Sequence, residues 1–507
     1  MIDMSKAASR PMAVAASLKG EALDEHAFYS LPVILTGEPD ALGTENGRWI
    51  FLDSIRLLLR VVGVLTIVLP EGMDDLAVEA NRIGNANFVR QPPKIQIGAS
   101  ELCFSDAKAI LNVGRQPRIG APWTSVSASG WLCRASSSAR ALEGDFNQPN
   151  PISSLFAASI GVSEVFKRLI GMSADAAPLI ETLTYSLFNF RDDNPDFGPV
   201  LPQSFSMPNT LLVGAGAIGS GIGLLSVQLR LEGCLHVVDK QRYQDENLGT
   251  CVLMERAGWS GKGKAARLAD WISSNGLAAA TGERALIADA IGSEKCIELC
   301  PRVVLGGLDD VSARHDAQML WPDLMIDGGI NNLGAAVVQH RIDERRQACL
   351  RCTFSLPATD VHAIQTELTG LDGETLSAPD RPLTAEDLAR ASPEKQQWLR
   401  QRLSEGKTVC SIVSEATMAK FGANLERDFK PSVPFVATAA ACLVMAEFTK
   451  YLLDRNAEYH QTSVVGNLFL GTSRSSSFNR AADPSCLCVL HHQNIVSMKA
   501  HRDADSI

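Results

Sequence analysis

The sequence predicts an α/β protein with two doubly wound, Rossmann-like domains, the first a degenerate copy of the second. Short apolar runs alternate with helical stretches in both halves, which is typical of parallel sheets covered by helices. One apolar run passes directly into Gly-x-Gly-x-x-Gly, in TLLVGAGAIGSGIG (residues 210–223). Two long apolar helical stretches, which begin at Pro151 and Pro434, resemble each other. Together these observations indicate the fold class.

The duplication rests on segments that correspond in the same order. Aligned at their prolines, the two helical stretches share an acid and a lysine at matching places: Glu164 and Lys167, Glu447 and Lys450. Three further segments of the first half have counterparts in the second: LPVILTG (31–37), AILNVG (109–114) and SVSASGWLCR (125–134). Four matches in order predict an internal repeat. We expect a pseudo-dimer within one chain, and hence a monomer.

The predicted boundaries follow from this repeat. Residues 1–190 form the degenerate domain, 191–209 are a linker rich in Pro, Asp and Asn, 210–352 and 411–507 build the intact domain, and 353–410 are a crossover segment inserted into it.

The first half lacks a usable glycine loop. Between Gly37 and Gly43 it carries Glu38, Pro39 and Asp40. Proline removes a backbone N–H and two carboxylates repel phosphate, so this loop is a poor nucleotide cradle. We expect the first half to be a structural or recognition partner.

Composition limits the partners. The chain has 507 residues and a net charge of −10, from 47 basic and 57 acidic residues. We expect binding neither to nucleic acid nor to anionic membranes, because both would repel it. The apolar stretch 55–69 is interrupted by Arg56 and Arg60, and 433–446 is shorter than the roughly 20 residues that cross a bilayer. Twelve cysteines without a convincing signal peptide indicate reduced thiols and a cytoplasmic protein.

The second half carries a nucleotide-binding pattern. Gly214, Gly216 and Gly219 permit a tight turn and a close backbone approach, and the following helix offers its N–H groups to phosphate. Asp239 stands twenty residues beyond the last glycine, after a second apolar run, where a carboxylate can bind ribose hydroxyls. This pattern alone does not distinguish NAD from ATP.

The residues that follow carry a resemblance. KQRYQDENLGTCVL (240–253), GKGKAARLADWI (261–272) and VVLGGLDDVSARHD (303–316) contain an acid before Asn-Leu, a Gly-x-x-Lys-Ala and an Asp pair with a downstream Arg. These resemble, in order, three signatures of the ThiF/MoeB and ubiquitin-activating enzyme superfamily. The resemblance covers about residues 209–488 apart from an insertion. The duplicated architecture is most like that of bacterial two-half enzymes of the BilD type from antiphage operons.

The resemblance implies consumption of ATP. Such an enzyme adenylates the C-terminal glycine of a ubiquitin-like protein and releases pyrophosphate. By resemblance, the glycine loop and Asp239 hold ATP, Lys264 contacts phosphate, Asp309 holds Mg²⁺ and Asn247 orders the nucleotide. Lys264 could instead be a solvated helix lysine and Asp309 a turn-forming acid. Arg314 is equally compatible with a structural and a catalytic role.

One departure concerns Thr250. The family usually has an arginine at this place, after Asn-Leu-x, and that arginine contacts phosphate. Either Arg242 or an arginine from the first half could replace it.

A zinc site is expected near the C-terminus. Cys349 and Cys352 have zinc-knuckle spacing, which the family often closes with a second Cys-x-x-Cys, and here Cys486 and Cys488 stand one residue closer together. A redox pair and plain buried cysteines are the alternatives, and His491 could substitute as a ligand.

Cys410 is the candidate thioester nucleophile. The crossover segment, with an expected helix over 385–403, delivers Cys410 just before the helix-like run SIVSEATMAKFG. A helix N-terminus stabilises a thiolate. Activating enzymes use a crossover cysteine to take the carrier from AMP as a thioester and pass it to a separate conjugating enzyme. Cys251 is the next candidate, and a small buried residue is the plain alternative.

Three other functions remain open. An NAD(P)-dependent oxidoreductase would use the same glycine loop but leaves Lys264 and Asp309 without a role. A ThiF-like enzyme would adenylate a sulfur carrier without forming a thioester. A non-enzymatic scaffold is disfavoured by the intact glycine loop.

Overall fold

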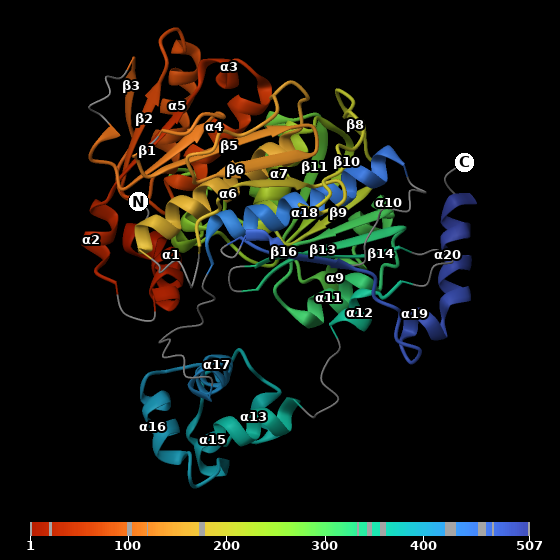
Figure 1. The fold of residues 1–507 in the computed structure, drawn as a ribbon. Coiled ribbons are helices and arrows are strands. Elements are labelled where there is room, and N and C mark those ends of the chain that lie inside the picture. Colours follow the sequence, from red (N-terminus) through yellow and green to blue (C-terminus); the bar gives the residue numbers. More distant parts are fainter. Residues whose placement is uncertain are drawn as a thin grey trace. The chain divides into compact units, whose positions relative to one another are not determined.

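Two sheets with the same strand order organise the protein, which is described here by a computed structural model (Figure 1). The structure describes residues 3–19, 23–98, 104–118, 120–171, 178–331, 334–341, 347–354, 361–420, 432–454, 463–468 and 471–504. The chain divides into two units, Met1–Phe354 with Pro431–Ile507, and Ser355–Lys430. Both sheets belong to the first of these.

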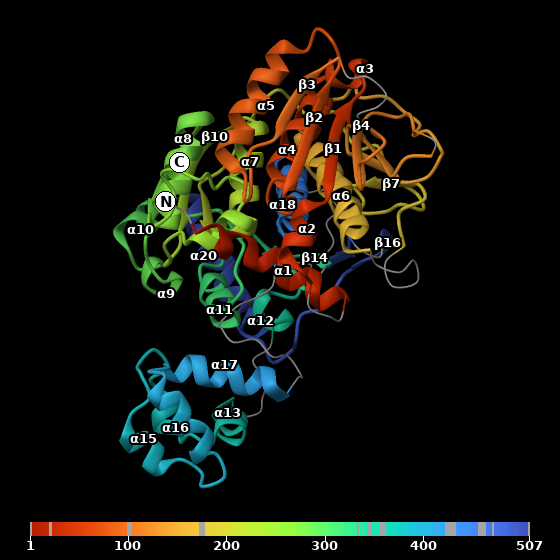
Figure 2. The same ribbon diagram turned by 90° about the vertical axis from the view of Figure 1, so that its left-hand side faces the viewer.

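The first sheet has the order β3-β2-β1-β4-β5-β6-β7, and Figure 2 shows its neighbouring strands β3, β2, β1 and β4. Pairing is parallel from β3 to β5 and antiparallel from β5 to β7. The bounds are β1 Pro32–Gly37, β2 Val64–Leu69, β3 Lys94–Ile97, β4 Ala109–Val113, β5 Trp123–Ser129, β6 Leu132–Ser136 and β7 Leu183–Ser186. The central strands are apolar and buried, as expected for a sheet covered on both faces.

The second sheet repeats this plan as β11-β10-β9-β12-β13-β14-β15-β16, with β8 beside β10. Pairing is parallel from β11 to β13 and antiparallel beyond. The bounds are β8 Phe205–Ser206, β9 Thr210–Val213, β10 Leu231–Val238, β11 Ala278–Glu283, β12 Val303–Gly306, β13 Leu324–Asn331, β14 Gly334–Arg341, β15 Ser463–Asn467 and β16 Gly471–Phe478. Strands β1, β4, β5 and β6 thus match β9, β12, β13 and β14, and the predicted fold class is confirmed.

Helices cover both sheets. Those of the first half are α1 Met4–Lys19, α2 Glu25–Ser30, α3 Pro39–Leu42, α4 Glu45–Leu58, α5 Asp74–Asn87 and α6 Pro151–Ile170. Those of the second are α7 Ala217–Gln228, the 3₁₀ helix η2 Asp245–Gly249, α8 Lys264–Asn275, α9 Ile287–Ala290, α10 Glu294–Leu299, α11 Val311–Gln318, α12 Leu350–Thr353, α18 Pro434–Leu453, α19 Leu487–Leu490 and α20 His492–Ala504.

The two halves meet through the matching helices α6 and α18. Helix α6 packs on β5, α18 packs on β13, and the two helices pack on each other (Figure 1). Both begin with proline at the first turn, where its missing N–H costs nothing. Helix α18 is long and apolar enough to cross a membrane, but 89% of its most apolar window is buried inside the protein. Its burial is that of a core helix.

The second unit is helical. It contains α13 Val361–Thr369, α14 Gly373–Leu376, α15 Ala385–Arg390, α16 Gln396–Ser404 and α17 Val409–Lys420. Its own apolar core consists of Leu371, Leu376, Leu383, Ala391, Leu399, Val409 and Ile412. We expected a crossover segment over 353–410; the compact unit spans Ser355–Lys430 and therefore includes α17. The expected helix over 385–403 is split, because Pro393 lacks the N–H that a continuous helix would need.

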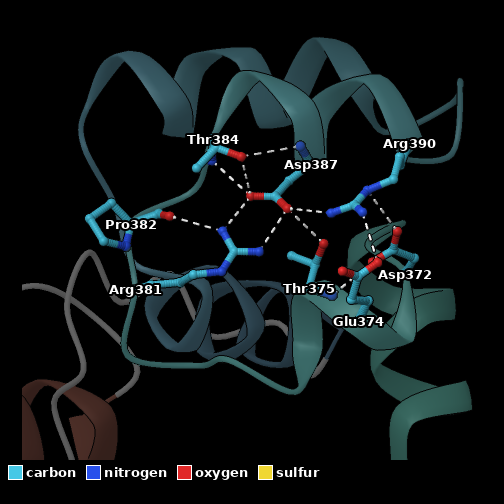
Figure 3. Close-up of polar contacts among 8 residues, drawn as sticks. All are labelled: Asp372, Glu374, Thr375, Arg381, Pro382, Thr384, Asp387 and Arg390. Carbon is cyan, nitrogen blue, oxygen red and sulfur yellow. Dashed lines mark hydrogen bonds and ion pairs between the residues drawn. The ribbon is translucent and has the colours of Figure 1, made fainter.

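Asp387 organises this helical unit (Figure 3). Its carboxylate is 1% exposed and accepts two hydrogen bonds from Arg381, at 2.6 and 2.8 Å, and one from Arg390 at 3.0 Å. Thr384 donates from both its backbone N–H and its hydroxyl, and the Thr375 hydroxyl donates at 2.9 Å. The Arg381 hydrogen bond is the main cause that holds the pKa of Asp387 well below its usual range.

Candidate functional site

The candidate site lies where the strand order of the second sheet reverses, between β9 and β12. Gly214 follows β9, and Gly307 follows its parallel neighbour β12. Gly214 has φ +93°, and a Cβ there would lie 2.9 Å from the Gly307 carbonyl oxygen. A Cβ on Gly219 would overlap the Gly214 carbonyl, whereas one on Gly216 would meet nothing within 4 Å. The loop is thus tightly closed at two glycines and open at Gly216, where α7 begins and its N–H groups are available to an anion.

Asp239 ties the end of β10 to this loop. Its carboxylate accepts hydrogen bonds from the N–H groups of Ala215, at 2.8 Å, and Gln241, at 2.7 Å. The buried hydroxyl of Tyr243 donates to the Ala215 carbonyl at 3.0 Å. Both polar groups of the Ala215 backbone are therefore used, which fixes the loop beside the carboxylate.

Lys264 is the first residue of α8 and is 6% exposed. Its ammonium donates to the Gln241 side-chain oxygen at 2.7 Å, and its backbone N–H donates to the Gln241 carbonyl at 3.0 Å. Gln241 therefore links Lys264 with Asp239. A lysine held this way is no solvated surface residue.

Asn247 lies in η2 and orders its own turn. Its side-chain oxygen accepts the Gln244 N–H at 2.9 Å, and its carbonyl oxygen accepts the N–H groups of Thr250 and Cys251, at 3.1 and 2.8 Å. Helix α1 of the first half covers this turn so closely that a Cβ on Gly249 would overlap the Ala7 carbonyl.

Thr250 is 1% exposed, and Arg242 and Arg10 are the two arginines considered in its place. Arg242 is exposed and donates to the Gly261 carbonyl at 2.9 Å. From the first half, Arg10 of α1 comes within 4.0 Å of Glu246 in η2.

Asp309 is exposed and stands three residues beyond β12, at the same sheet edge as the glycine loop. The preceding residue is fixed by Arg314, which donates to the Leu308 carbonyl and, at 2.7 Å, to Asp327. Burial raises the pKa of Asp327 to about 6 against the opposing effect of Arg314. Of the two roles considered for Arg314, structural and catalytic, these contacts favour the structural one.

The matching place in the first half is filled by the chain itself. The Glu38 carboxylate follows β1 and accepts the N–H groups of Arg115, at 2.8 Å, and Gln116, at 2.6 Å, just after β4. A Cβ on Gly114 would overlap this carboxylate. A side-chain carboxylate therefore occupies this crevice of the first half, where it would repel a phosphate, in agreement with a degenerate copy.

The four predicted cysteine ligands converge. The sulfur atoms of Cys349, Cys352, Cys486 and Cys488 all lie within 4.8 Å of one another. The separations are 3.8 Å for Cys349–Cys352, 3.6 Å for Cys349–Cys486 and 3.5 Å for Cys352–Cys488. Tetrahedral zinc with Zn–S bonds of about 2.3 Å needs sulfurs about 3.8 Å apart. The cluster fits zinc without His491, whose side chain is exposed.

The two candidate nucleophiles differ in access. Cys410 is exposed at the second position of α17, and its N–H donates to the Pro379 carbonyl at 2.8 Å. Cys251 is 1% exposed, and burial raises the pKa of its thiol. Of the two, Cys410 has the accessible sulfur.

Hydrogen bonds join the glycine loop, Asp239 and Lys264 into one network. Asp309 lies at the same edge of the sheet, and Asn247 lies in the adjoining turn. Sequence reasoning missed Gln241 and Tyr243, which join these parts and lie inside the stretch that carries the resemblance. It also missed the contacts that Arg60, a charge in an apolar stretch, makes with backbone carbonyls of the second half.

Comparisons with known proteins find only a distant similarity to solved structures. No family model matches the sequence, and no curated protein matches it. The solved structure of Escherichia coli MccB with MccA-N7isoASN matches at 13% identity and a TM-score of 0.34, over 57% of this chain and 68% of that one. Escherichia coli MccB with ATP matches at 13% identity and a TM-score of 0.33, over 56% of this chain and 66% of that one.

Proposed function

We propose that the second half binds ATP with Mg²⁺ and uses it to adenylate the C-terminal carboxylate of a protein substrate. The observation that carries this proposal is the bonded group around the glycine loop: Asp239 and Gln241 join that loop to Lys264. A buried ammonium that hydrogen bonds connect, through Gln241 and Asp239, to a glycine loop with an open helix N-terminus suits a polyphosphate. Asp309, at the same edge, supplies a carboxylate for a divalent cation.

The proposed chemistry is an in-line displacement. A substrate carboxylate oxygen attacks the α-phosphorus, the bond from that phosphorus to the bridging oxygen breaks, and pyrophosphate leaves. The N–H groups of α7 and the Lys264 ammonium bind the phosphates, and Asp239 accepts hydrogen bonds from the ribose hydroxyls. Asp309 would hold Mg²⁺, and Asn247 orders the nucleotide. Bound Mg²⁺ would screen the negative charge that two anions bring together.

The missing arginine at Thr250 has a candidate replacement in the first half. Arg10 lies on α1, the helix that covers η2, while Arg242 is held by the Gly261 carbonyl. We assign the additional phosphate cation to Arg10.

The signature motifs and the crossover unit support a proposal on the substrate class. We propose a ubiquitin-like protein as the carrier, a thioester with Cys410 after adenylation, and transfer to a separate conjugating enzyme. By resemblance, a bacterial antiphage conjugation pathway is the setting. The single chain supplies both halves, so we propose that it acts as a monomer. We also propose a cytoplasmic location.

The reaction is tested by exchange of labelled pyrophosphate into ATP, with purified protein, Mg-ATP and candidate carriers. We expect carrier-dependent exchange that Asp309→Ala abolishes. The matched control is Asp310→Asn, because Asp310 caps α11 by accepting the Ala313 N–H, which asparagine can also do. Full exchange by Asp309→Ala would contradict the metal assignment. Tight NADH binding without exchange would instead favour an oxidoreductase.

A further inference from the structure

Arg60 of the first half is fully buried, with 0% of the residue exposed. It lies two residues after α4. Within its own half it donates to the Arg56 carbonyl and, at 2.9 Å, to the Asn87 side-chain oxygen. A buried guanidinium is costly unless its N–H groups have hydrogen-bond partners, so the other N–H groups of Arg60 need acceptors too.

Those partners lie in the second half. Arg60 Nη2 is 3.0 Å from the carbonyl oxygen of Cys251, 2.9 Å from that of Val252 and 2.8 Å from that of Met254, and Nε is 3.3 Å from the Cys251 oxygen. All three of these residues are buried. One arginine therefore holds a run of carbonyl groups across the boundary between the halves.

The segment 251–254 is joined to two parts of the candidate site. The Cys251 N–H donates to the Asn247 carbonyl at 2.8 Å, so one residue connects Arg60 with the turn of Asn247. The Val252 N–H donates to the Ser220 hydroxyl at 3.1 Å, and Ser220 follows Gly219 in α7. The residues that Arg60 contacts are thus hydrogen-bonded both to the turn of Asn247 and to the first turn of α7.

We propose that Arg60 is a positioning residue for the nucleotide site of the second half. By fixing the carbonyls of 251–254 it fixes the turn of Asn247 and the first turn of α7. The degenerate half, whose own crevice is filled by Glu38, retains a role in holding the intact one. The inference rests on the proposed function.

The test compares Arg60→Met with Arg56→Met. Arg56 lies in α4, four residues before Arg60, is largely buried and pairs with Asp53 at 3.7 Å, but its side chain has no described contact with 251–254. For each variant we measure the affinity for MgATP by titration calorimetry and the midpoint of thermal unfolding. Both variants should unfold at lower temperature. Arg60→Met should also lose about tenfold in MgATP affinity, the scale of a charged hydrogen-bond network, whereas Arg56→Met should keep it.

A conservative variant, Arg60→Lys, distinguishes a positioning role of Arg60 from a role in stability alone. Arg60→Lys retains the charge but cannot reach several carbonyls at once, so its MgATP affinity should lie between those of wild type and Arg60→Met. If Arg60→Met yields no folded protein, Arg60→Lys against Arg56→Met decides. Affinities that fall equally at both positions, or not at Arg60, would overturn the positioning role. Absence of MgATP binding by the wild type would instead overturn the proposed function, and this inference with it.

Discussion

Lys450 and Glu447 form an ion pair one helical turn apart in α18, with 0% of either side chain exposed. The Lys450 ammonium also donates to the Phe188 carbonyl of the first half at 2.9 Å. The matching residues of α6, Glu164 and Lys167, form the equivalent pair at 2.5 Å. The repeat in the sequence thus preserves a buried ion pair on each side of the boundary between the halves.

Removing one member of the α18 pair should be severely destabilising. Lys450→Met leaves the Glu447 carboxylate buried without this cation, and we expect the free energy of unfolding to fall by about 3–5 kcal/mol. Adding Glu447→Leu should recover most of the loss, because the double variant buries no charge there. Urea denaturation checks both. The control is Lys499→Met, from a pair with Asp323 in which the lysine is 31% exposed, expected within about 1 kcal/mol of wild type.

The similarity of α6 and α18 could be predicted from the sequence, but their contacts could not. Matching Glu164 with Glu447 and Lys167 with Lys450 predicted the duplication, because a repeat keeps residue types in order even when contacts are unknown. The pattern could not show that both pairs are buried, or that Lys450 also bonds across the boundary to Phe188. Likewise, the spacing of Cys349 and Cys352 predicted a metal site, while Arg60 gave no motif because most of its partners are backbone carbonyls far away in the sequence. Long-range contacts of this kind require no particular residue type at the accepting position.

Zinc removal should unfold the C-terminal part of the larger unit. We expect one zinc per chain by elemental analysis, loss of that zinc in Cys352→Ser, and a lower unfolding temperature both in that variant and in wild type treated with chelator. The control is Cys234→Ser, an exposed cysteine outside the cluster, which should keep its zinc. Full zinc content in Cys352→Ser would contradict the four-cysteine site.

Asp53 should make stability depend on pH. It is 1% exposed, and burial raises its pKa to about 6 against the effects of Arg56 and of the Gln228 amide, which donates to it at 2.9 Å. An acid whose pKa is higher in the folded state stabilises at low pH and loses that contribution as the pH rises from about 4 to 6. Relative to Asp53→Asn, the wild type should lose up to about 3 kcal/mol between pH 4 and 7. Gln228→Met, which removes a group that lowers the pKa, should move this loss to higher pH. A pH-independent difference would show that Asp53 does not titrate in this range.

Asp387 should control the integrity of the helical unit. In Asp387→Ala, two arginines and two threonines lose their common acceptor, and we expect a loss of about 3–5 kcal/mol confined to that unit. Limited proteolysis should then cut within 361–420 before it cuts elsewhere. Glu374→Ala is the control, because Glu374 is 80% exposed in its pair with Arg390. Equal protection of 361–420 in both variants would contradict the central role of Asp387.

Cys410→Ala should separate the two chemical steps. In the proposed second step the Cys410 thiol loses its proton to solvent and its sulfur attacks the acyl carbon of the adenylate. A C–S bond forms, the C–O bond to the phosphate breaks and AMP leaves. The variant should keep pyrophosphate exchange, since adenylation precedes this step, but lose the carrier adduct that a reductant cleaves on a non-reducing gel. Cys300→Ala, another exposed cysteine, should keep both. An adduct that persists in Cys410→Ala would place the nucleophile elsewhere. Exchange without any adduct in the wild type would identify a ThiF-like adenylating enzyme that forms no thioester.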